Sequence, residues 1–554
     1  MKRAICILLI FSFVFSLAAC GAPQIDENMK TRYAYPKRYD IHGKYSMKNA
    51  VKDTNELYEA ICEAYPDRPV LAVIRQSYSG EIYPLELNDA LNLWLSENGY
   101  GFSLMVYSFG NYGLNDGKTF EKQVKEYIEA GGRCDIIVSG ANTVNLSGIP
   151  GDTVWDYVND GLIVPLGSTA TEEQLKAVAD IYGEDYLKIN SDNGEIYGFS
   201  TSTLEVSDRG GYLASYNMAG FPGEEPESVR DFAFLNTLPK ESKLQAMFDT
   251  GRGYLDKMVN KKIFTSAFTV SETASVEGFI NSVLMDESYT QVNMLPLYIH
   301  ESETGTEVLA LWEIPMFEEI MQGYVELVEE GDLDLNAHRD GGTFYYFESY
   351  AEPQFAQKQM ERENEVMGNF SQRVVVPMSK VKSVTGPECS MFVASGSENK
   401  DLAVEFAISA LTDEALGRAL CMGVEGVSYT VENGVRKDIM NNIDTIIYPN
   451  SMYMIPTEYE LENSREIARE LQSGAEFDLY ENFNADLSDC REEAEALAAW
   501  AKRYQNAIWI FDEEATEAYG YNMKTFLENP VYPEIEGLRA SVERQIEEYD
   551  KIYR

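Results

Sequence analysis

The fold follows from residues 70–138, a stretch that begins Val70-Leu-Ala-Val-Ile74 and ends Cys134-Asp-Ile-Ile-Val138. Both ends are short apolar runs, as expected for buried strands. Between them the apolar spacing predicts two amphipathic helices and a further strand, over 85–98, 120–130 and 102–107. Strands that alternate with helices of this length are typical of an α/β layer with a parallel sheet.

The carboxyl ends of parallel strands carry the loops that meet ligands, so we expect binding residues directly after each strand. These loops span 75–80, 108–113 and 139–145. Aromatic rings pack on the apolar faces of sugars, while hydroxyl and amide groups bond to their polar rims. The candidate ligand-binding residues of this first half are Tyr78, Phe109, Tyr112, Ser139 and Asn142.

The first twenty residues predict export and lipid attachment. Met1-Lys2-Arg3 is a short positive region, and residues 4–16 form an apolar stretch too short to span a membrane, as in a secretory signal. The following Leu17-Ala18-Ala19-Cys20-Gly21 resembles a bacterial lipobox, which implies acyl chains on Cys20. We therefore expect a signal peptide over 1–19, a lipid-anchored tether over 20–54, and a protein held on the extracytoplasmic face of the cell membrane.

Composition narrows the class of protein further. A chain of 554 residues is too long for one core, so two or three domains are expected. Its net charge of −46 argues against a nucleic-acid partner, and its 45% hydrophobic content is ample for packed cores. Without Cys6 and Cys20, an odd number of widely spaced cysteines remains, which does not indicate a disulfide framework.

Motifs that carry catalysis or hold a metal are scarce. The three histidines form no HExxH arrangement, and no P-loop, GxSxG or GxGxxG opens a helix after a strand. Asp332-Leu-Asp-Leu-Asn336 begins like a calcium loop, but Ala337 stands where such a loop needs glycine. We expect no metal, no cofactor and no enzymatic activity. Acidic residues are so numerous that a catalytic carboxylate pair stays open as an alternative.

The order of elements resembles the family 1 extracellular solute-binding proteins of ABC importers, which include the maltose-binding and other oligosaccharide-binding proteins. Ser200 departs from the proline that the family often has at this position. Four stretches carry the resemblance: Cys134-Asp-Ile-Ile-Val-Ser-Gly-Ala141 with Tyr157-Val-Asn-Asp-Gly-Leu-Ile-Val-Pro-Leu166, Gly194-Glu-Ile-Tyr-Gly-Phe-Ser200, Gly341-Gly-Thr-Phe-Tyr-Tyr-Phe347, and Ser397-Glu-Asn-Lys-Asp-Leu-Ala-Val-Glu-Phe-Ala407 with Leu411-Thr-Asp-Glu-Ala-Leu-Gly417.

The resemblance implies a two-lobed α/β protein, like the periplasmic binding proteins, with mostly parallel sheets and lobes that close on a ligand about a hinge. The chain is expected to cross between the lobes near 199–202 and 376–377. A monomer that delivers its ligand to permease subunits in the membrane is implied. The expected division is a first lobe over 55–199, a second lobe over 200–374, a return to the first lobe over 375–440, and a helical C-terminal part over 441–554 that packs mainly on the second lobe.

The resemblance also adds candidate ligand-binding residues in the later part of the chain. Tyr345 and Tyr346 stand where the family has a strand-to-helix junction with a ligand-stacking aromatic residue, usually tryptophan. The further candidates are Trp312, Glu348, Glu425 and Tyr429. The other four tryptophans lie in predicted helices at core spacing and are left out: Trp94, Trp155, Trp500 and Trp509.

An oligosaccharide is the first expectation for the ligand, and a peptide or another small polar solute the next. Two other functions stay open at this point. One is an exported, lipid-tethered glycoside hydrolase, which would consume its sugar. The other is a sensory lipoprotein of the same fold that signals to a receptor kinase.

Overall fold

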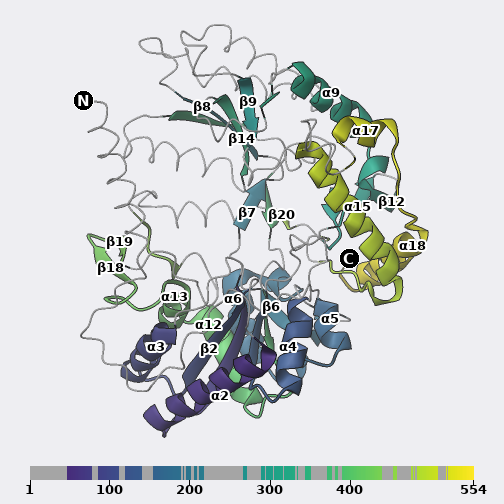
Figure 1. The fold of residues 1–554 in the computed structure, drawn as a ribbon. Coiled ribbons are helices and arrows are strands. Elements are labelled where there is room, and N and C mark those ends of the chain that lie inside the picture. The colour runs from purple at the N-terminus through teal and green to yellow at the C-terminus, as the bar shows by residue number, and fades with distance from the viewer. Residues whose placement is uncertain are drawn as a thin grey trace, which may run out of the picture.

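The computed structural model describes most of the chain from residue 46 onward, and Figure 1 shows its fold. The described residues are 46–77, 85–110, 119–139, 154–188, 191–192, 195–200, 205–208, 211–217, 266–270, 289–293, 295–302, 305–315, 317–330, 333–334, 343–350, 371–376, 381–384, 390–439, 453–457, 476–477, 480, 483–509, 520 and 522–553. Within these ranges, no helix has both the length and the apolar character needed to cross a membrane.

The first of two five-stranded sheets is built from the stretch that the sequence singled out. Its strand order is β2-β1-β3-β17-β6. The strands are β1 (Val70–Ser77), β2 (Ser103–Gly110), β3 (Ile136–Ser139), β6 (Gly198–Ser200) and β17 (Ser390–Val393). β1 pairs in parallel with β2 and β3, as predicted, whereas β17 runs antiparallel to β3 and β6.

Helices cover both faces of this sheet, which explains why its strands are apolar without alternation. Val70 and Ala72 of β1 face one helical layer, and Leu71 and Val73 face the other. The first layer holds α2 (Met47–Ala64), α4 (Phe120–Glu129) and α5 (Val154–Asn159). The second layer holds α3 (Leu85–Glu97), α6 (Glu172–Tyr182), α12 (Lys400–Thr412) and α13 (Glu414–Met422). We call this sheet and its helices the first body.

The start of the first body differs from the sequence-based division. α2 begins at Met47, before the boundary expected at residue 54. Its first two turns bury Ala50 and Val51 against the rest of the first body, together with the polar side chains of Asp53 and Thr54. Polar residues on the inward face hid the helical period there. Residues 47–54, expected in the tether, are therefore part of the first body, and residues 1–45 lie outside the described residues.

The second five-stranded sheet lies apart from the first and at the other end of the view in Figure 1. Its order is β13-β9-β14-β8-β15. The strands are β8 (Gly211–Asn217), β9 (Ser266–Val270), β13 (Leu333–Asp334), β14 (Thr343–Tyr350) and β15 (Ser371–Val376). β9 pairs in parallel with β13 and β14, whereas β8 is antiparallel to β14 and β15. Both five-stranded sheets are thus mixed, and the prediction of mostly parallel sheets was too strong.

Short strands form the connection between the two sheets. The chain leaves the first sheet after β6 and passes through β7 (Glu205–Asp208) to β8. It returns from β15 through β16 (Val381–Val384) to β17. β7 and β16 pair antiparallel, and β20 (Glu476–Phe477) pairs in parallel with β16. Figure 1 shows β7 and β20 between the two sheets. The passages begin next to the predicted crossing positions.

A third group of elements packs beside the second sheet and includes the C-terminus. It contains an antiparallel meander and four helices: β10 (Tyr289–Gln291), β11 (Leu297–Ser302), β12 (Gly305–Ala310), α9 (Phe317–Glu330), α15 (Arg491–Trp509), α17 (Met523–Glu528) and α18 (Glu536–Tyr553). α9 contacts β13, and α18 contacts β12. We call the second sheet together with this group the second body.

The remaining elements are short. Two hairpins pair antiparallel, β4 (Ser191–Asp192) with β5 (Glu195–Ile196) and β18 (Tyr429–Glu432) with β19 (Val435–Asp438). The 3-10 helices are Leu166–Ser168, Glu184–Lys188, Leu311–Glu313 and Ser488–Cys490. Within the described residues the cysteines carry free thiols, at Cys62, Cys134, Cys421 and Cys490.

Candidate functional site

The edge of the first sheet where β1, β2 and β3 end is the first candidate region. Ser77 at the end of β1 is in register with Gly110 at the end of β2. β17 begins at the same edge and β6 ends there, because Ser390 pairs with both Ser139 and Ser200. The passage to the second body also starts at this edge, directly after β6. The loops of the first sheet therefore gather on the side from which the chain leaves for the second body.

Ser139, a predicted ligand-binding residue, lies at this edge with an unused hydroxyl group. Its side chain is 1% exposed, and its Oγ has no hydrogen-bond partner among the described residues. Buried hydroxyls are normally paired, because an unpaired one loses its bonds to water without compensation. Next to it, Tyr186 donates its hydroxyl hydrogen to the carbonyl oxygen of Ser200. The edge thus combines a fixed strand end with a hydroxyl that has capacity for one more partner.

The structure places Phe109, another predicted residue, in the core. Its ring is 2% exposed and packs edge-on against Tyr107, Phe120 and Tyr127. β2 continues to Gly110, so Phe109 takes an inward strand position instead of a place in a loop. We therefore leave Phe109 out of the proposed site.

Trp312, Glu425 and Tyr429 lie in two separate places. Trp312 stacks on Tyr532 in the second body, with ring centroids 4.6 Å apart and an angle of 14° between the planes. Tyr429 begins β18 beside α13, and burial raises the pKa of its hydroxyl. Glu425 is exposed and forms an isolated bridge with Tyr429. The structure does not bring the Trp312 position together with the other two.

Tyr345, Tyr346 and Glu348 lie within β14, the central strand of the second sheet. The strand continues through all three positions to Tyr350, and the residues that follow it directly lie outside the described part of the chain. A run of four aromatic residues favours continued strand structure, and β9 and β8 pair with it on either side. The structure describes the backbone of these three residues but not their side chains. Four other candidates lie wholly outside the described residues: Cys20, Tyr78, Tyr112 and Asn142.

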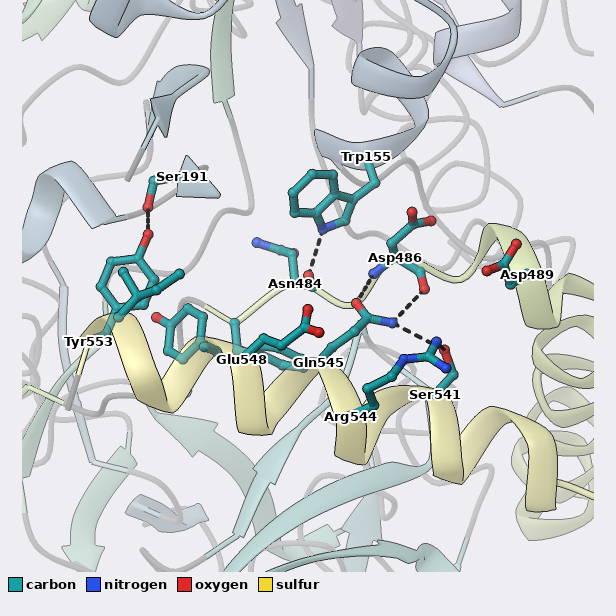
Figure 2. Close-up of a pocket in the computed structure, with 13 residues that line it drawn as sticks. Trp155, Ser191, Asn484, Asp486, Asp489, Ser541, Arg544, Gln545, Glu548 and Tyr553 are labelled. Atoms are coloured by element: carbon teal, nitrogen blue, oxygen red, sulfur yellow. Dashed lines mark hydrogen bonds between the residues drawn. The ribbon is translucent and has the colours of Figure 1, made fainter. Parts of the chain in front are cut away.

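A pocket of about 260 Å³ lies between the first body and the C-terminal helix (Figure 2). The first body contributes Trp155 of α5 and Ser191 of β4. The opposite wall is one face of α18, whose lining residues recur three or four positions apart along the helix. This face consists of Ser541, Arg544, Gln545, Glu548, Tyr549, Ile552 and Tyr553. The chain before α15 closes the pocket with Phe483, Asn484, Asp486 and Asp489.

Direct bonds cross from the first body to these C-terminal residues. The indole N–H of Trp155 donates to the carbonyl oxygen of Asn484 at 2.6 Å. The hydroxyls of Ser191 and Tyr553 are hydrogen-bonded at 2.6 Å. Outside the pocket lining, Arg491 forms an ion pair with Asp156 of α5 at 3.0 Å. The two bodies therefore meet at this pocket through polar contacts.

Hydrogen bonds also join the segment before α15, which closes the pocket, to other parts of the second body. The side-chain amide of Asn293, next to β10, donates to the carbonyl oxygen of Ala485 at 2.8 Å and accepts from its N–H at 3.0 Å. The side-chain amide of Gln545 makes the same pair of bonds with the backbone of Asp486, at 2.8 Å and 2.7 Å. The pocket thus has one wall from each body.

The lining of this pocket combines aromatic rings with hydrogen-bonding side chains. Its aromatic rings offer apolar faces, and its carboxylate, amide and guanidinium groups bond hydroxyls. The aromatic residues are Trp155, Phe483, Tyr549 and Tyr553. Within the described residues, no group of three His, Cys, Asp or Glu side chains is placed to hold a metal ion.

Comparison with known proteins identifies the fold. No protein-family model matches the sequence, and neither does any curated protein. The crystal structure of the N-glycan transport solute binding protein NgtS from Streptococcus pneumoniae matches with a TM-score of 0.55 and 14% identity, over 87% of this chain and 99% of that one. The chain has the fold of the ABC-transporter solute-binding proteins. The family resemblance predicted from the sequence is thus confirmed for the fold.

A second structure of NgtS, in complex with Man5GlcNAc, matches with a TM-score of 0.51 and 15% identity, over 88% of this chain and 99% of that one. In both comparisons nearly the whole of NgtS is covered. The pocket-lining helix α18 thus belongs to a chain of which 87% and 88% is covered in the two matches.

The pocket residues of this solute-binding-protein fold were largely missed by the sequence analysis. Trp155 was assigned to a core because it lies in a helix, but its helix α5 is short and its ring lies partly open beside Asn484. One signal was present in the sequence. The face of α18 that lines the pocket mixes tyrosine with charged and amide residues, which is unusual for a buried face. Nothing in the sequence indicated that this face meets Trp155.

Proposed function

We propose that this chain is the solute-capturing component of an ABC importer and that it binds an oligosaccharide between its two bodies. The observation that carries the proposal is the pocket, because α5 and β4 of the first body and α18 of the second body each supply one wall. A solute in such a pocket contacts both bodies at once. The match to the fold of solute-binding proteins supports reading this pocket as a solute site.

The mechanism is closure of the two bodies on the solute, with β7, β16 and β20 as the connection about which they move. A ligand stabilises the arrangement for which it has the higher affinity, and only by that difference. A solute that touches Trp155 on one side and α18 on the other gains contacts only when both walls are together. The closed form is then the signal that a permease in the membrane recognises.

The choice of an oligosaccharide rests on the lining and on the relative. NgtS is described as an N-glycan transport protein and was crystallised with Man5GlcNAc. The pocket of this chain offers aromatic faces beside carboxylate and amide groups, which is the combination that sugars require. The unpaired hydroxyl of Ser139 supplies a further hydrogen-bonding group at the edge of the first sheet.

The test is a binding measurement on the full chain with Cys20→Ser, which removes the acylated residue. We expect members of a glycan panel to raise the melting temperature, and to be recovered unchanged by mass spectrometry after prolonged incubation. Recovery of shortened glycans would instead support a glycoside hydrolase. If no glycan, peptide or other polar solute in the panel binds, the proposed function is wrong.

Two substitutions of Trp155 locate the solute. Trp155→Ala removes the ring and the bond to Asn484, so we expect glycan affinity to fall about tenfold or more. Trp155→Phe keeps a ring without the N–H and should retain most of the affinity. Tyr532→Ala is the matched control, because it removes a partly exposed ring from the Trp312 stack, away from the pocket. Equal effects of Trp155→Ala and Tyr532→Ala would place the solute elsewhere.

Membrane attachment and transport form the remaining part of the proposal. Acyl chains on Cys20 would hold the protein at the extracytoplasmic face, since two or more chains give stable anchoring. Cell fractionation should find the native chain with the membrane and the Cys20→Ser chain in the medium or the soluble fraction. Uptake of a labelled glycan that stops when the gene is deleted supports transport, whereas unchanged uptake with a lost transcriptional response supports a sensor.

A further inference from the structure

The pocket beside α18 carries an unbalanced charge. Among the described lining residues, the carboxylate groups belong to Asp486, Asp489 and Glu548, and the one cationic group is the guanidinium of Arg544. The sign of this imbalance is the same as that of the whole chain, which has a net charge of −46. A narrow site with one sign of charge favours solutes of the opposite sign or of none.

The carboxylates of the pocket differ in how far they are already engaged. Asp486 accepts a hydrogen bond from the backbone N–H of Ser488 at 2.9 Å. In Figure 2, Glu548 rises from α18 toward Asn484 and the ring of Trp155, so its carboxylate points into the space between the two bodies. Arg544 donates to the hydroxyl of Ser541 on its own helix at 3.2 Å. The cation is thus directed along α18, while Glu548 reaches toward the opposite wall.

The field of these carboxylates acts on a neighbouring group as well. The pKa of the Cys490 thiol is raised, first by burial and then by the negative charges of Glu493, Asp486 and Asp489. Cys490 follows Asp489 in the chain and lies on the 3-10 helix at the end of the pocket. An anion that enters the pocket meets the same negative potential.

We infer that this pocket selects saccharide units without a negative charge, either uncharged or amine-bearing, and rejects uronates. The inference rests on the proposed function and assigns a class of substrate to the same site. The affinity gained when a sugar ring packs on Trp155 does not depend on the charge of the sugar. Differences in affinity between sugars of equal size therefore come from the carboxylates of Glu548, Asp489 and Asp486. A uronate brings a further carboxylate close to these groups, and among the described lining residues Arg544 is the one cation that can pair with it.

The experiment compares matched sets of tri- to pentasaccharides by calorimetry on the full Cys20→Ser chain. One set is neutral, built from mannose, glucose and N-acetylglucosamine. A second set is glucosamine, and the third contains galacturonate, mannuronate and glucuronate. We expect the amine-bearing and neutral sets to contain the tightest ligands, and uronates to bind roughly tenfold or more weakly at low salt, with a smaller difference at high salt.

Charge-neutralising variants identify the groups responsible. Glu548→Gln combined with Asp489→Asn removes two pocket charges, and within the described residues neither carboxylate has a hydrogen bond or ion pair that the amide would lose. This variant should bring uronate affinity within about threefold of neutral affinity, because the repulsion acts through close charges. The matched control is Glu543→Gln with Glu547→Gln, which removes two exposed charges from α18 outside the pocket and should leave the preference unchanged.

The outcomes separate this inference from the proposed function. Binding of no saccharide from any set overturns both. Binding of uronates as tightly as neutral sugars overturns the inference alone, and so does an equal response of the pocket variant and the control variant. A melting temperature within about 2 °C of the parent chain for each variant shows that the comparison is between folded proteins.

Discussion

The edge strand of the first sheet is closed by two side chains, and this arrangement yields a quantitative prediction. Among the strands that the structure describes, β2 has a neighbour only on its β1 side. On its open side, Asn92 of α3 donates to the carbonyl oxygen of Leu104 and accepts from its N–H, both at 2.7 Å. Asn88 makes the same pair of bonds with Val106, at 3.0 Å and 2.8 Å. The two amides thus take the place of a neighbouring strand.

Asn92→Leu keeps the volume of the side chain and removes its bonds. Leu104 is 0% exposed, so its N–H and carbonyl oxygen would be left without partners in a dry environment. Each unsatisfied buried group costs about 1–3 kcal/mol, part of which the apolar leucine offsets. We expect the free energy of unfolding of the first body to fall by about 3 kcal/mol. At about 2–4 °C per kcal/mol, the melting temperature should fall by roughly 6–12 °C.

The assay is urea and thermal unfolding followed by tryptophan fluorescence, for which Trp94 on the same helix is a local reporter. Asn98→Leu is the matched control, because Asn98 is exposed near the end of α3 and its side chain donates only to the carbonyl oxygen of Trp94. A surface change of this kind is expected to stay within about 0.5 kcal/mol. A loss below about 1 kcal/mol for Asn92→Leu would refute the argument that these amides satisfy the open edge.

Two further substitutions test other parts of the structure. Gly198→Ala places a Cβ within 2.4 Å of a ring carbon of Phe392, just before the chain leaves the first sheet, so thermal unfolding should show a loss of about 1–3 kcal/mol. Side-chain hydrogen bonds with Glu121 and Lys125 lower the pKa of Asp160. The ionised carboxylate therefore stabilises the fold above the unfolded-state pKa of about 4, and this stabilisation is lost as the pH falls through the lower folded-state pKa. Asp160→Asn should therefore lower the melting temperature at pH 7 and have no effect near pH 2, and an equal effect at both pH values would contradict this assignment.

The order of elements in the first body could be predicted because each is marked locally. The run Val70 to Ile74 is apolar throughout, and the structure extends it through Arg75 and Gln76 to Ser77 because β2 continues to pair there. Polar residues in a paired strand end carry no local signal. The antiparallel position of β17 was also hidden, since Ser390 meets Ser139 only after the chain has passed through the second sheet.

The candidate site was harder to predict because its walls are distant in sequence. Trp155 and Asn484 are 329 positions apart, and Ser191 and Tyr553 are 362 apart. Hydrophobic period and turn signals describe a few neighbouring residues, so they identify α18 as a helix without indicating which surface its polar face meets. Phe109 shows the opposite error: a loop was expected where the strand continues, and an aromatic ring assigned to the ligand belongs to the core.

The contacts between the two bodies at the pocket explain how a solute can control their arrangement. They include a hydrogen bond from Trp155, a hydrogen bond between Ser191 and Tyr553, bonds of the Asn159 amide to Asp486 at 3.4 Å, and an ion pair of Arg491 with a partly exposed aspartate. Each such contact contributes about 1 kcal/mol or less, so together they hold the bodies by only a few kcal/mol. A solute that contacts both walls adds an energy of the same size, which is enough to shift a two-state population by one or two orders of magnitude. Under the proposed function, an apolar interface would hold the bodies together without the ligand, whereas these polar contacts leave the solute able to determine closure.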